Sequence, residues 1–534
     1  MRRPRLTLAV VVTAALAVRL VGIRHGLPFV YNPDEGLHFV PRAVDAAGGD
    51  WDPGYYENPS ALTYLLAVVF LAADVLGAGI RSGFDADPTT AFTVARVVVA
   101  LLGCALVLAV HRAGRACFDE RVGVLAAAFV AFGFLPVFYS HQALNDVPTM
   151  LPVTLALLAC VALLDRGGPG RAALAGALVG LAAGTKYLAA PLALVVAVAV
   201  VLRVVDRKER MTRGVLLLLL AALACVAALL LTNPYLALDL DTAREQLGGQ
   251  STQAASAKLG QDGTAWTYYP VSLLWGLGVV PTALAALGAV AAFRTDHRRA
   301  LLLTTFPVAL LAYLGTQDRF FARWLLPAYP MLAVLAAYGA VRLAGWVRER
   351  LAADRSRGAW VLPVLAAVSL AQPVVDAVRS DAVLVRADTR GLALDWMEDH
   401  VGGSRRIVVE PAVPGRYLPA DGGWTRFPVS RPYQAYEERL DPALVDDYRA
   451  GGYCWVMVNS HQRDRGLAAG LPGAEAYYRR LDEESTVVAR FSPYRPGATA
   501  PDFSYDFSFD WYPWAFERPG PYVELRRLTD CAVS

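Results

Sequence analysis

The chain has 534 residues, of which 56% are hydrophobic and only 18% are charged. Its mean hydropathy is positive. A soluble chain of this length would form several domains and would not carry so many apolar residues. The composition therefore excludes a wholly soluble protein and indicates that much of the chain faces lipid. The net charge of +3 gives no indication of nucleic acid as a partner.

Apolar segments long enough to cross roughly 30 Å of hydrocarbon as helices recur along the first two thirds of the chain. The first of them is expected to be a true span and not a cleaved signal peptide, because no small-residue cleavage site follows it. The sequence predicts about eleven spans: Leu6–Ile23, Thr90–Val110, Val122–Tyr139, Pro148–Leu164, Ala172–Ala183, Leu188–Val204, Gly214–Leu231, Val271–Phe293, Leu301–Leu314, Trp324–Trp346 and Ala359–Val375.

The segment Pro59–Ile80 is also long enough to span, and the distribution of arginines decides its placement. If this segment lies along the membrane, the arginine-rich loops, such as those around Arg112, Arg207 and Arg298, all fall on one side, which the positive-inside rule makes cytosolic. We therefore expect a juxtamembrane or re-entrant helix there. The N-terminus is then cytosolic, and the remaining loops and the tail lie outside the cell membrane.

The tail has the composition of a soluble α/β domain, so we expect two domains, 1–378 in the membrane and 379–534 outside it. Expected elements of the tail are the helix Leu392–Asp399, with Trp396 facing a core, and the strands Arg406–Glu410, Trp455–Asn459 and Thr486–Phe491. The aromatic segment Asp502–Pro521 is expected to be ordered near the membrane interface. Cys454 and Cys531 could form a disulfide bond, although a buried free thiol at Cys454 is equally natural.

The polar residues that could do chemistry gather in the outer loops. Asp34 and Glu35 follow Pro33, which can begin a short helix that places His38 one turn after Asp34. Two adjacent carboxylates suit general base catalysis and hydroxyl binding, but acidic residues also commonly cap a helix N-terminus.

Three further outer segments carry charges beside apolar helices. Asp146 begins a span, where it could also be a cap, and His141 precedes it in the same loop. Lys186 follows Gly184 in an apolar stretch, which suggests a broken helix facing a cavity, although a lysine could also snorkel to the interface. Arg323 lies at the start of a helix on the outer side, where the positive-inside rule disfavours arginine. An anion is therefore expected to hold it there.

The series of motifs resembles the GT-C superfamily of polyprenyl-phosphate-dependent membrane glycosyltransferases. Within it, the chain looks like the protein O-mannosyltransferase and aminoarabinose-transferase branch, family 39. The resemblance covers about Leu6 to Val375 in order and spacing. It rests on Asp34-Glu35, Glu57-Asn58-Pro59-Ser60, Arg96, Ala143-Leu144-Asn145-Asp146-Val147-Pro148, Gly184-Thr185-Lys186-Tyr187 and Arg323-Trp324-Leu325-Leu326-Pro327-Ala328-Tyr329-Pro330.

The resemblance implies an all-α polytopic domain of the GT-C type, with juxtamembrane helices and an extracytoplasmic α/β domain. It implies an inverting transfer of a sugar, mannose or another hexose or pentose, from a polyprenyl-phosphate carrier to a hydroxyl acceptor on a protein, a glycan or a glycolipid. Asp34 would be the catalytic base and Glu35 would hold hydroxyl groups. The donor phosphate would be bound by Lys186, Arg323 and His141.

Two questions stay open at this point. Asp146, His38 and Glu57 could bind substrate, or the first two could join Asp34 around a divalent cation, although the family's O-mannosyltransferases are described as not needing metal. The chain could also be a transporter or lipid-linked sugar flippase, or a membrane scaffold without catalytic activity. The position of the charges at one membrane surface favours the enzyme over the transporter, whose charges would lie at mid-depth.

Overall fold

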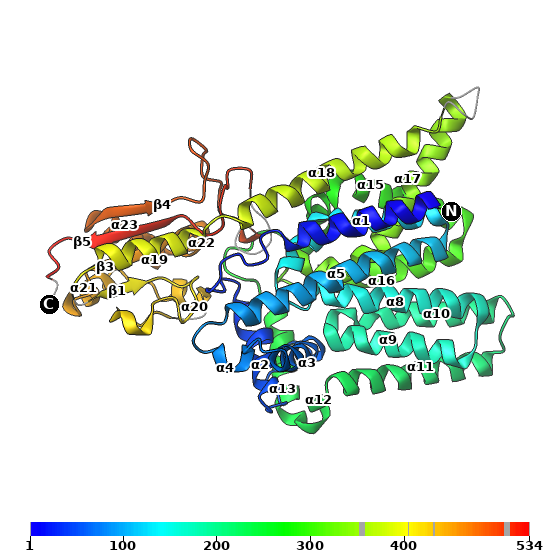
Figure 1. Ribbon diagram of the computed structural model, residues 1–534, viewed down its shortest axis with the longest axis horizontal. Coiled ribbons are helices and arrows are strands. Elements are labelled where there is room, and N and C mark those ends of the chain that lie inside the picture. The colour runs from blue at the N-terminus through cyan, green and yellow to red at the C-terminus, as the bar shows by residue number, and fades with distance from the viewer. Residues whose placement is uncertain (1, 352–357, 404, 431–432, 507–512, 533–534) are drawn as a thin grey trace. The chain divides into compact units, whose positions relative to one another are not determined.

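A computed structural model of the chain (Figure 1) describes residues 2–351, 358–403, 405–430, 433–506 and 513–532. These residues form two compact units. The membrane unit comprises Met1–Ile23, Leu37–Ser256 and Gly263–Arg379, and the C-terminal unit comprises Arg24–Gly36, Ala257–Asp262 and Ser380–Ser534. The second unit thus includes two short segments that a single boundary at 378/379 assigns to the membrane domain.

The membrane unit is built almost wholly from helices (Figure 1). The long helices and their direct extensions are α1 (Arg2–Leu20), α5 (Thr89–Cys117), α6 (Glu120–Phe132), α7 (Phe134–Phe138), η2 (Tyr139–His141), α8 (Asp146–Arg166), α9 (Pro169–Thr185), η3 (Tyr187–Leu192), α10 (Ala193–Val205), α11 (Met211–Thr232), α14 (Ala265–Leu273), η4 (Leu274–Gly278), α15 (Val279–Thr295), α16 (His297–Gly315), η5 (Ala322–Ala328), α17 (Tyr329–Leu351) and α18 (Val361–Leu384). The short connecting helices are η1 (Glu35–Phe39), α2 (Val40–Ala47), α3 (Ala61–Val75), α4 (Ile80–Gly83), α12 (Tyr235–Leu238) and α13 (Leu240–Ala254).

Seven helices among the described residues are long and apolar enough to cross a membrane, and the number is eight if α6 and the bent segment Phe134–His141 count as one span. Three other expected spans form helices that are too short or too polar to be counted among these seven. These are α1, whose described apolar part is Leu6–Leu20, α9 with 17 residues, and α16, which opens with His297, Arg298 and Arg299. The chain is therefore a multi-pass membrane protein with the mostly helical fold expected from its sequence.

The segment around α3 differs from the spans in length. Its 15 residues rise about 22 Å at 1.5 Å per residue, which is less than the hydrocarbon thickness. The short helices α2, α3, α12 and α13 gather at one end of the bundle (Figure 1). Tyr56 links them, because its backbone N–H donates to Gln246 Oε1 (2.6 Å) and its hydroxyl donates to Asp52 Oδ1 (2.7 Å).

Helices α9 and α11 pack with their backbones in close contact along a seam of glycines. A Cβ at Gly176 or Gly180 would overlap the backbone of Ala221 or Cys225 in α11. A Cβ at Gly184 would overlap the side chain of Thr232. Small residues at every fourth position let helices approach in this way in membranes.

The C-terminal unit contains a sheet of five strands in the order β2-β1-β3-β5-β4. The strands are β1 (Arg406–Val409), β2 (Thr425–Arg426), β3 (Trp455–Asn459), β4 (Ser485–Phe491) and β5 (Val523–Leu528). β1 runs parallel to β2 and β3, whereas β5 is antiparallel to β3 and β4. The three expected strands are confirmed, and β2 and β5 are additional. The helical elements are α19 (Thr389–His400), η6 (Ala420–Gly422), α20 (Tyr433–Glu438), α21 (Leu444–Ala450), α22 (Ser460–Ala468) and α23 (Pro472–Glu483).

The strands alternate their side chains between two hydrophobic cores. Ile407 and Met457 belong to the core that includes α19, where Trp396 packs at the edge. Val408 and Val456 belong to the core formed with the tyrosine-rich helices α20, α21 and α23. Both faces of the sheet are thus covered, as expected for an α/β domain.

Cys454, beside β3, and Cys531, just after β5, form a disulfide bond, which decides between the two alternatives that the sequence left open. Of the aromatic segment Asp502–Pro521, residues 507–512 lie outside the described part of the chain. In the remainder, Tyr505 is buried and Phe516 forms an isolated β-bridge with Tyr494. Its place at the membrane interface stays a prediction.

Candidate active site

An ion pair joins two of the expected site residues in the membrane unit. Asp146 is the first residue of α8, and Lys186 caps the end of α9 in an extended conformation. The Lys186 ammonium donates to Asp146 Oδ1, and both side chains are buried, with 8% and 3% of their surface exposed. Because two isolated buried charges would be costly, each residue compensates the charge of the other.

Two asparagines fix the loops around this ion pair. Asn145 Nδ2 donates to the carbonyl oxygen of Thr185 (2.8 Å), which ties the start of α8 to the end of α9. Asn233, just after α11, donates to the carbonyl oxygen of Gly184 (3.2 Å) and accepts a hydrogen bond from the backbone N–H of Ser60. Asn233 was missed in the sequence analysis, although an Asn-Pro step directly after a long apolar helix could have indicated it.

His38 and the segment that contains Glu57 also lie together. The His38 ring stacks on Tyr55 with centroids 4.4 Å apart, and the Arg42 guanidinium lies over the same ring at 4.5 Å. Asn58 Nδ2 donates to the Tyr55 hydroxyl (2.9 Å). Glu57 is half-buried within this segment.

The same segment reaches the loop of the ion pair. The hydroxyl of Tyr187, the residue after Lys186, donates to the carbonyl oxygen of Tyr56 (3.0 Å). Glu57, Lys186 and Asp146 therefore lie on segments that are hydrogen-bonded to one another.

Arg323 and His141 occupy different kinds of environment. The Arg323 guanidinium lies 5.2 Å from the ring of Phe321 and 5.9 Å from that of Tyr139, so aromatic faces contribute to holding the cation. The two ring nitrogens of His141 face the carbonyl oxygens of Val137 (3.0 Å) and Val21 (2.8 Å). A phosphate could bind His141 only if one of these contacts opened.

Asp34 and Glu35 belong to the segment Arg24–Gly36 of the C-terminal unit. The expected short helix forms: the chain is helical from Pro33, and a π-helical turn at Glu35–Phe39 leads directly into α2. Asn32 Oδ1 accepts from the backbone N–H groups of Asp34 (3.0 Å) and Glu35 (3.3 Å). Asn32 therefore caps this turn, and capping does not require the Asp34 carboxylate. Glu35 is fully buried.

The suggested cation site would combine Asp34 of the C-terminal unit with Asp146 and His38 of the membrane unit. Within the part of the chain that the structure describes, no group of three or more His, Cys, Asp or Glu side chains is placed to hold a metal ion. The involvement of a divalent cation stays a hypothesis without geometric support.

Comparisons with known proteins agree with this architecture. Residues 89–231 match the family model described as dolichyl-phosphate-mannose-protein mannosyltransferase. No curated protein matches the chain. The solved structure of ArnT from Cupriavidus metallidurans bound to undecaprenyl phosphate is similar, with 15% identity, a TM-score of 0.54 and 98% of each chain covered.

The chain has the GT-C fold. The apo oligosaccharyltransferase of Archaeoglobus fulgidus is similar as well, with 15% identity, a TM-score of 0.55, and 88% of this chain and 72% of that chain covered. Another structure from Archaeoglobus fulgidus, AglB in complex with an inhibitory peptide and a dolichol-phosphate, has 13% identity, a TM-score of 0.52 and coverages of 91% and 73%.

The resemblance to GT-C proteins that the sequence indicated is thereby confirmed at the level of the fold, and a family model of mannosyltransferases matches part of the membrane unit. The structure joins Asp146 to Lys186 and places Glu57 and His38 on neighbouring segments. The catalytic and phosphate-binding roles of the individual residues stay predictions.

Proposed function

We propose that this protein is an inverting glycosyltransferase that moves a sugar from a polyprenyl-phosphate carrier to a hydroxyl acceptor at the outer face of the membrane. The observation that carries the proposal is the buried Asp146–Lys186 pair at the break between helices in a GT-C fold. A lysine in a partly dry site can bind a phosphate group. ArnT, which is similar over 98% of both chains, was solved with undecaprenyl phosphate.

The proposed reaction is one direct displacement. The acceptor oxygen attacks the anomeric carbon, the bond from that carbon to the phosphate oxygen breaks, and the polyprenyl phosphate leaves with the bonding electrons. Asp34 takes the proton of the acceptor hydroxyl. Lys186 and Arg323 balance the charge of the leaving phosphate, and His141 is a third candidate for this role. Hydroxyl groups of the substrates are positioned by Glu35, Glu57 and His38. Asp146 positions a hydroxyl group or Lys186.

We infer that the C-terminal unit lies outside the cytosol. The disulfide between Cys454 and Cys531 is the support for this location, because disulfides persist in oxidising compartments. The arginine-rich loops then face the cytosol, in agreement with the positive-inside rule. The substrates would accordingly meet the enzyme on the extracytoplasmic side.

The test is transfer from a labelled polyprenyl-phosphate sugar by the full-length protein in nanodiscs. Asp34→Asn removes the base but keeps the size of the side chain, so we expect the rate to fall by about 10²–10⁴ while donor binding is kept. Asp45→Asn, at an exposed aspartate of α2, is the matched control and should retain full activity. Normal transfer by Asp34→Asn would remove Asp34 from the reaction, and absence of transfer by the wild-type protein with every polyprenyl-phosphate sugar would refute the proposed function.

A further inference from the structure

The C-terminal unit contains a pocket that the proposed transfer reaction does not use. It encloses about 930 Å³, which lies within the 300–1,000 Å³ typical of small-molecule sites. Its walls come from α22, the end of β4 with the loop that follows, and the start of β5. Arginines, carboxyl groups and aromatic rings line it, among them Arg490, Arg495, Arg518, Asp464, Glu524 and Tyr522.

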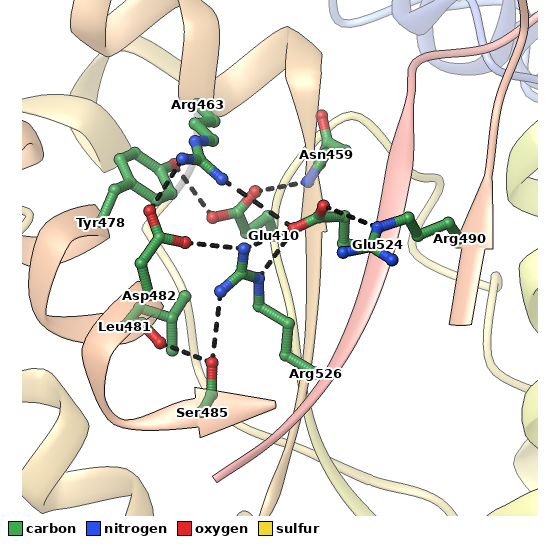
Figure 2. Close-up of polar contacts among 10 residues, drawn as sticks. All are labelled: Glu410, Asn459, Arg463, Tyr478, Leu481, Asp482, Ser485, Arg490, Glu524 and Arg526. Atoms are coloured by element: carbon green, nitrogen blue, oxygen red, sulfur yellow. Dashed lines mark hydrogen bonds and ion pairs between the residues drawn. The ribbon is translucent and has the colours of Figure 1, made fainter. Parts of the chain in front are cut away.

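The carboxylate of Glu524, which lines the pocket, is already paired with arginines (Figure 2). Glu524 Oε2 accepts from Arg526 Nε (2.9 Å), and Glu524 Oε1 lies 3.5 Å from Arg490 Nε. Arg526 also reaches Asp482 (2.6 Å) behind the wall. Arg490 is 60% exposed, and its contacts are the longer ion pair with Glu524 and a hydrogen bond with Tyr522, so part of its guanidinium is left to bind a further anion.

Two further arginines of the lining, Arg495 and Arg518, also have no close carboxylate partner among the described residues. Glu517 forms its short ion pair with Arg386 (3.0 Å), whereas Arg518, which lines the pocket, lies 3.6 Å from the other Glu517 oxygen. Arg495 lies 5.9 Å from the ring of Trp514 and has no carboxylate partner among the described residues. Three lining arginines are therefore weakly paired or unpaired with protein carboxylates.

The pocket also offers groups suited to hydroxyls and to the apolar face of a ring. Asp464 has no ion pair within the described ranges, and burial raises the pKa of its carboxyl group to about 6, so at neutral pH it is mostly an acceptor. Tyr494 and Tyr522 are parallel, with centroids 6.3 Å apart. Tyrosine rings offer an apolar contact surface, and arginines can donate two parallel hydrogen bonds to an acid group. Together they suit a ligand that has both a polar edge and an apolar face.

We propose that this pocket binds an acidic saccharide, a sugar that carries a carboxylate or a phosphate group. Arg490, Arg495 and Arg518 would bind the acid group, Asp464 would accept hydroxyl hydrogen bonds, and Tyr522 would contact the ring. The proposal names an acceptor class and in that respect rests on the proposed function. Binding itself requires neither the lipid donor nor the transfer step.

The experiment is isothermal titration calorimetry of the full-length protein in nanodiscs, without lipid donor. The probes are tri-galacturonate and mannose 6-phosphate, and uncharged trigalactose, inorganic phosphate and hexaglutamate are the comparisons. We expect the two acidic sugars to bind at least tenfold more tightly than the three comparison compounds, and the tighter of the two identifies the acid group. Equal binding of trigalactose, phosphate or hexaglutamate, or no binding of either acidic sugar, would overturn the proposal.

Variants connect binding to the pocket. Arg495→Gln combined with Arg518→Gln should weaken binding of the acidic sugar by roughly tenfold or more, since two charge-assisted hydrogen bonds are lost. Arg479→Gln, at an exposed arginine of α23 that does not line the pocket, is the control and should bind normally. Unchanged affinity in the double variant would show that the sugar binds elsewhere. Because no transfer is measured, failure of the proposed enzyme activity leaves this result interpretable.

Discussion

The membrane unit and the C-terminal unit both bury carboxyl groups, but they satisfy them by different means. Asp146 in the membrane unit faces the ammonium group of Lys186. Glu410 in the C-terminal unit accepts hydrogen bonds from the backbone N–H of Asn459 (2.8 Å), the Tyr478 hydroxyl (2.9 Å) and the Tyr436 hydroxyl (3.2 Å). Glu437 is a second buried carboxyl group, close enough to Glu410 to interact with it electrostatically. Neither of its carboxylate oxygens has a hydrogen-bond partner among the described residues.

The difference teaches how the surroundings decide whether a buried carboxyl group keeps its charge. Burial raises the pKa of Glu410 to about 7, and the three donors limit that rise. Burial and the nearby Glu410 raise the pKa of Glu437 to about 9. Glu437 is therefore neutral at physiological pH. Asp146, by contrast, has the ammonium group of Lys186 as its counter-ion.

The largest effect is expected from breaking the ion pair of the membrane unit. Asp146→Asn leaves Lys186 buried without its counter-charge, so the free energy of unfolding should fall by about 3–5 kcal/mol. The double variant Asp146→Leu/Lys186→Met should recover most of this loss while remaining inactive in transfer. Thermal unfolding in detergent measures both. Equal destabilisation of the single and double variants would show that the pair is not the main source of stability at this position.

The next effect concerns Glu437 and depends on pH. Because the pKa is higher in the folded state than the ordinary value of about 4.3, the folded state binds more protons, and stability falls as the pH rises from about 4.3 to about 9. Glu437→Gln should remove this slope and stabilise the protein at pH 8 by on the order of 2 kcal/mol. Pulse proteolysis of the full-length protein at pH 6 and pH 8 measures it, with the exposed Glu438→Gln as control. A variant as sensitive to pH as the wild type would contradict the assignment.

A smaller effect tests how the membrane unit holds its second cation. Arg323 lies between aromatic faces, and lysine cannot reproduce its planar stacking or its bidentate hydrogen bonds. Arg323→Lys should lower kcat/KM for the lipid-phosphate donor roughly tenfold with unchanged thermal stability. Steady-state kinetics at varied donor concentration checks this, and wild-type values would remove Arg323 from the donor site.

The smallest effect is expected at Glu410, where two contributions oppose each other. Burial raises the pKa of this carboxyl group to about 7, so its ionisation costs stability at pH 8, as it does at Glu437. Hydrogen bonds offset part of that cost, because Glu410 accepts from the Asn459 N–H and from two tyrosine hydroxyls, and the NH₂ group of glutamine cannot accept from those hydroxyls. Glu410→Gln should therefore stabilise the protein at pH 8 by about 1 kcal/mol less than Glu437→Gln does. The same proteolysis assay applies, and equal stabilisation by the two glutamine variants would show that hydrogen bonding does not distinguish the two groups.

Much of the helical architecture could be predicted because hydropathy is a local property of the chain. The strands Arg406–Val409 and Trp455–Asn459 were predictable for the same reason, since each is a short apolar run. β5, with the sequence VELRRL, was missed because Arg526 is buried by ion pairs with Glu524 and Asp482 rather than by apolar packing. The partner Asp482 is distant in the sequence, so this part of the pairing could not be read from the strand itself.

The candidate site was predictable in its residue types but not in its contacts. Lys186 and Asp146 were expected separately, one as a phosphate ligand and one as a cap or substrate ligand, and only the fold shows that they form an ion pair. The role of Asn32 as the cap before Glu35 also depends on backbone geometry. Sequence spacing gives no information on which of two neighbouring polar side chains turns toward the backbone.

The glycine seam between α9 and α11 has a consequence for protein engineering. Because a methyl group at Gly176 or Gly180 would overlap the backbone of α11, no other residue type fits there without separating the helices. Gly184 continues the seam and lies two residues before Lys186. Chimaeras that exchange α9 without α11 would therefore mismatch at the seam and displace Lys186. Segments for recombination should instead be cut so that Pro169–Asn233 moves as a single block.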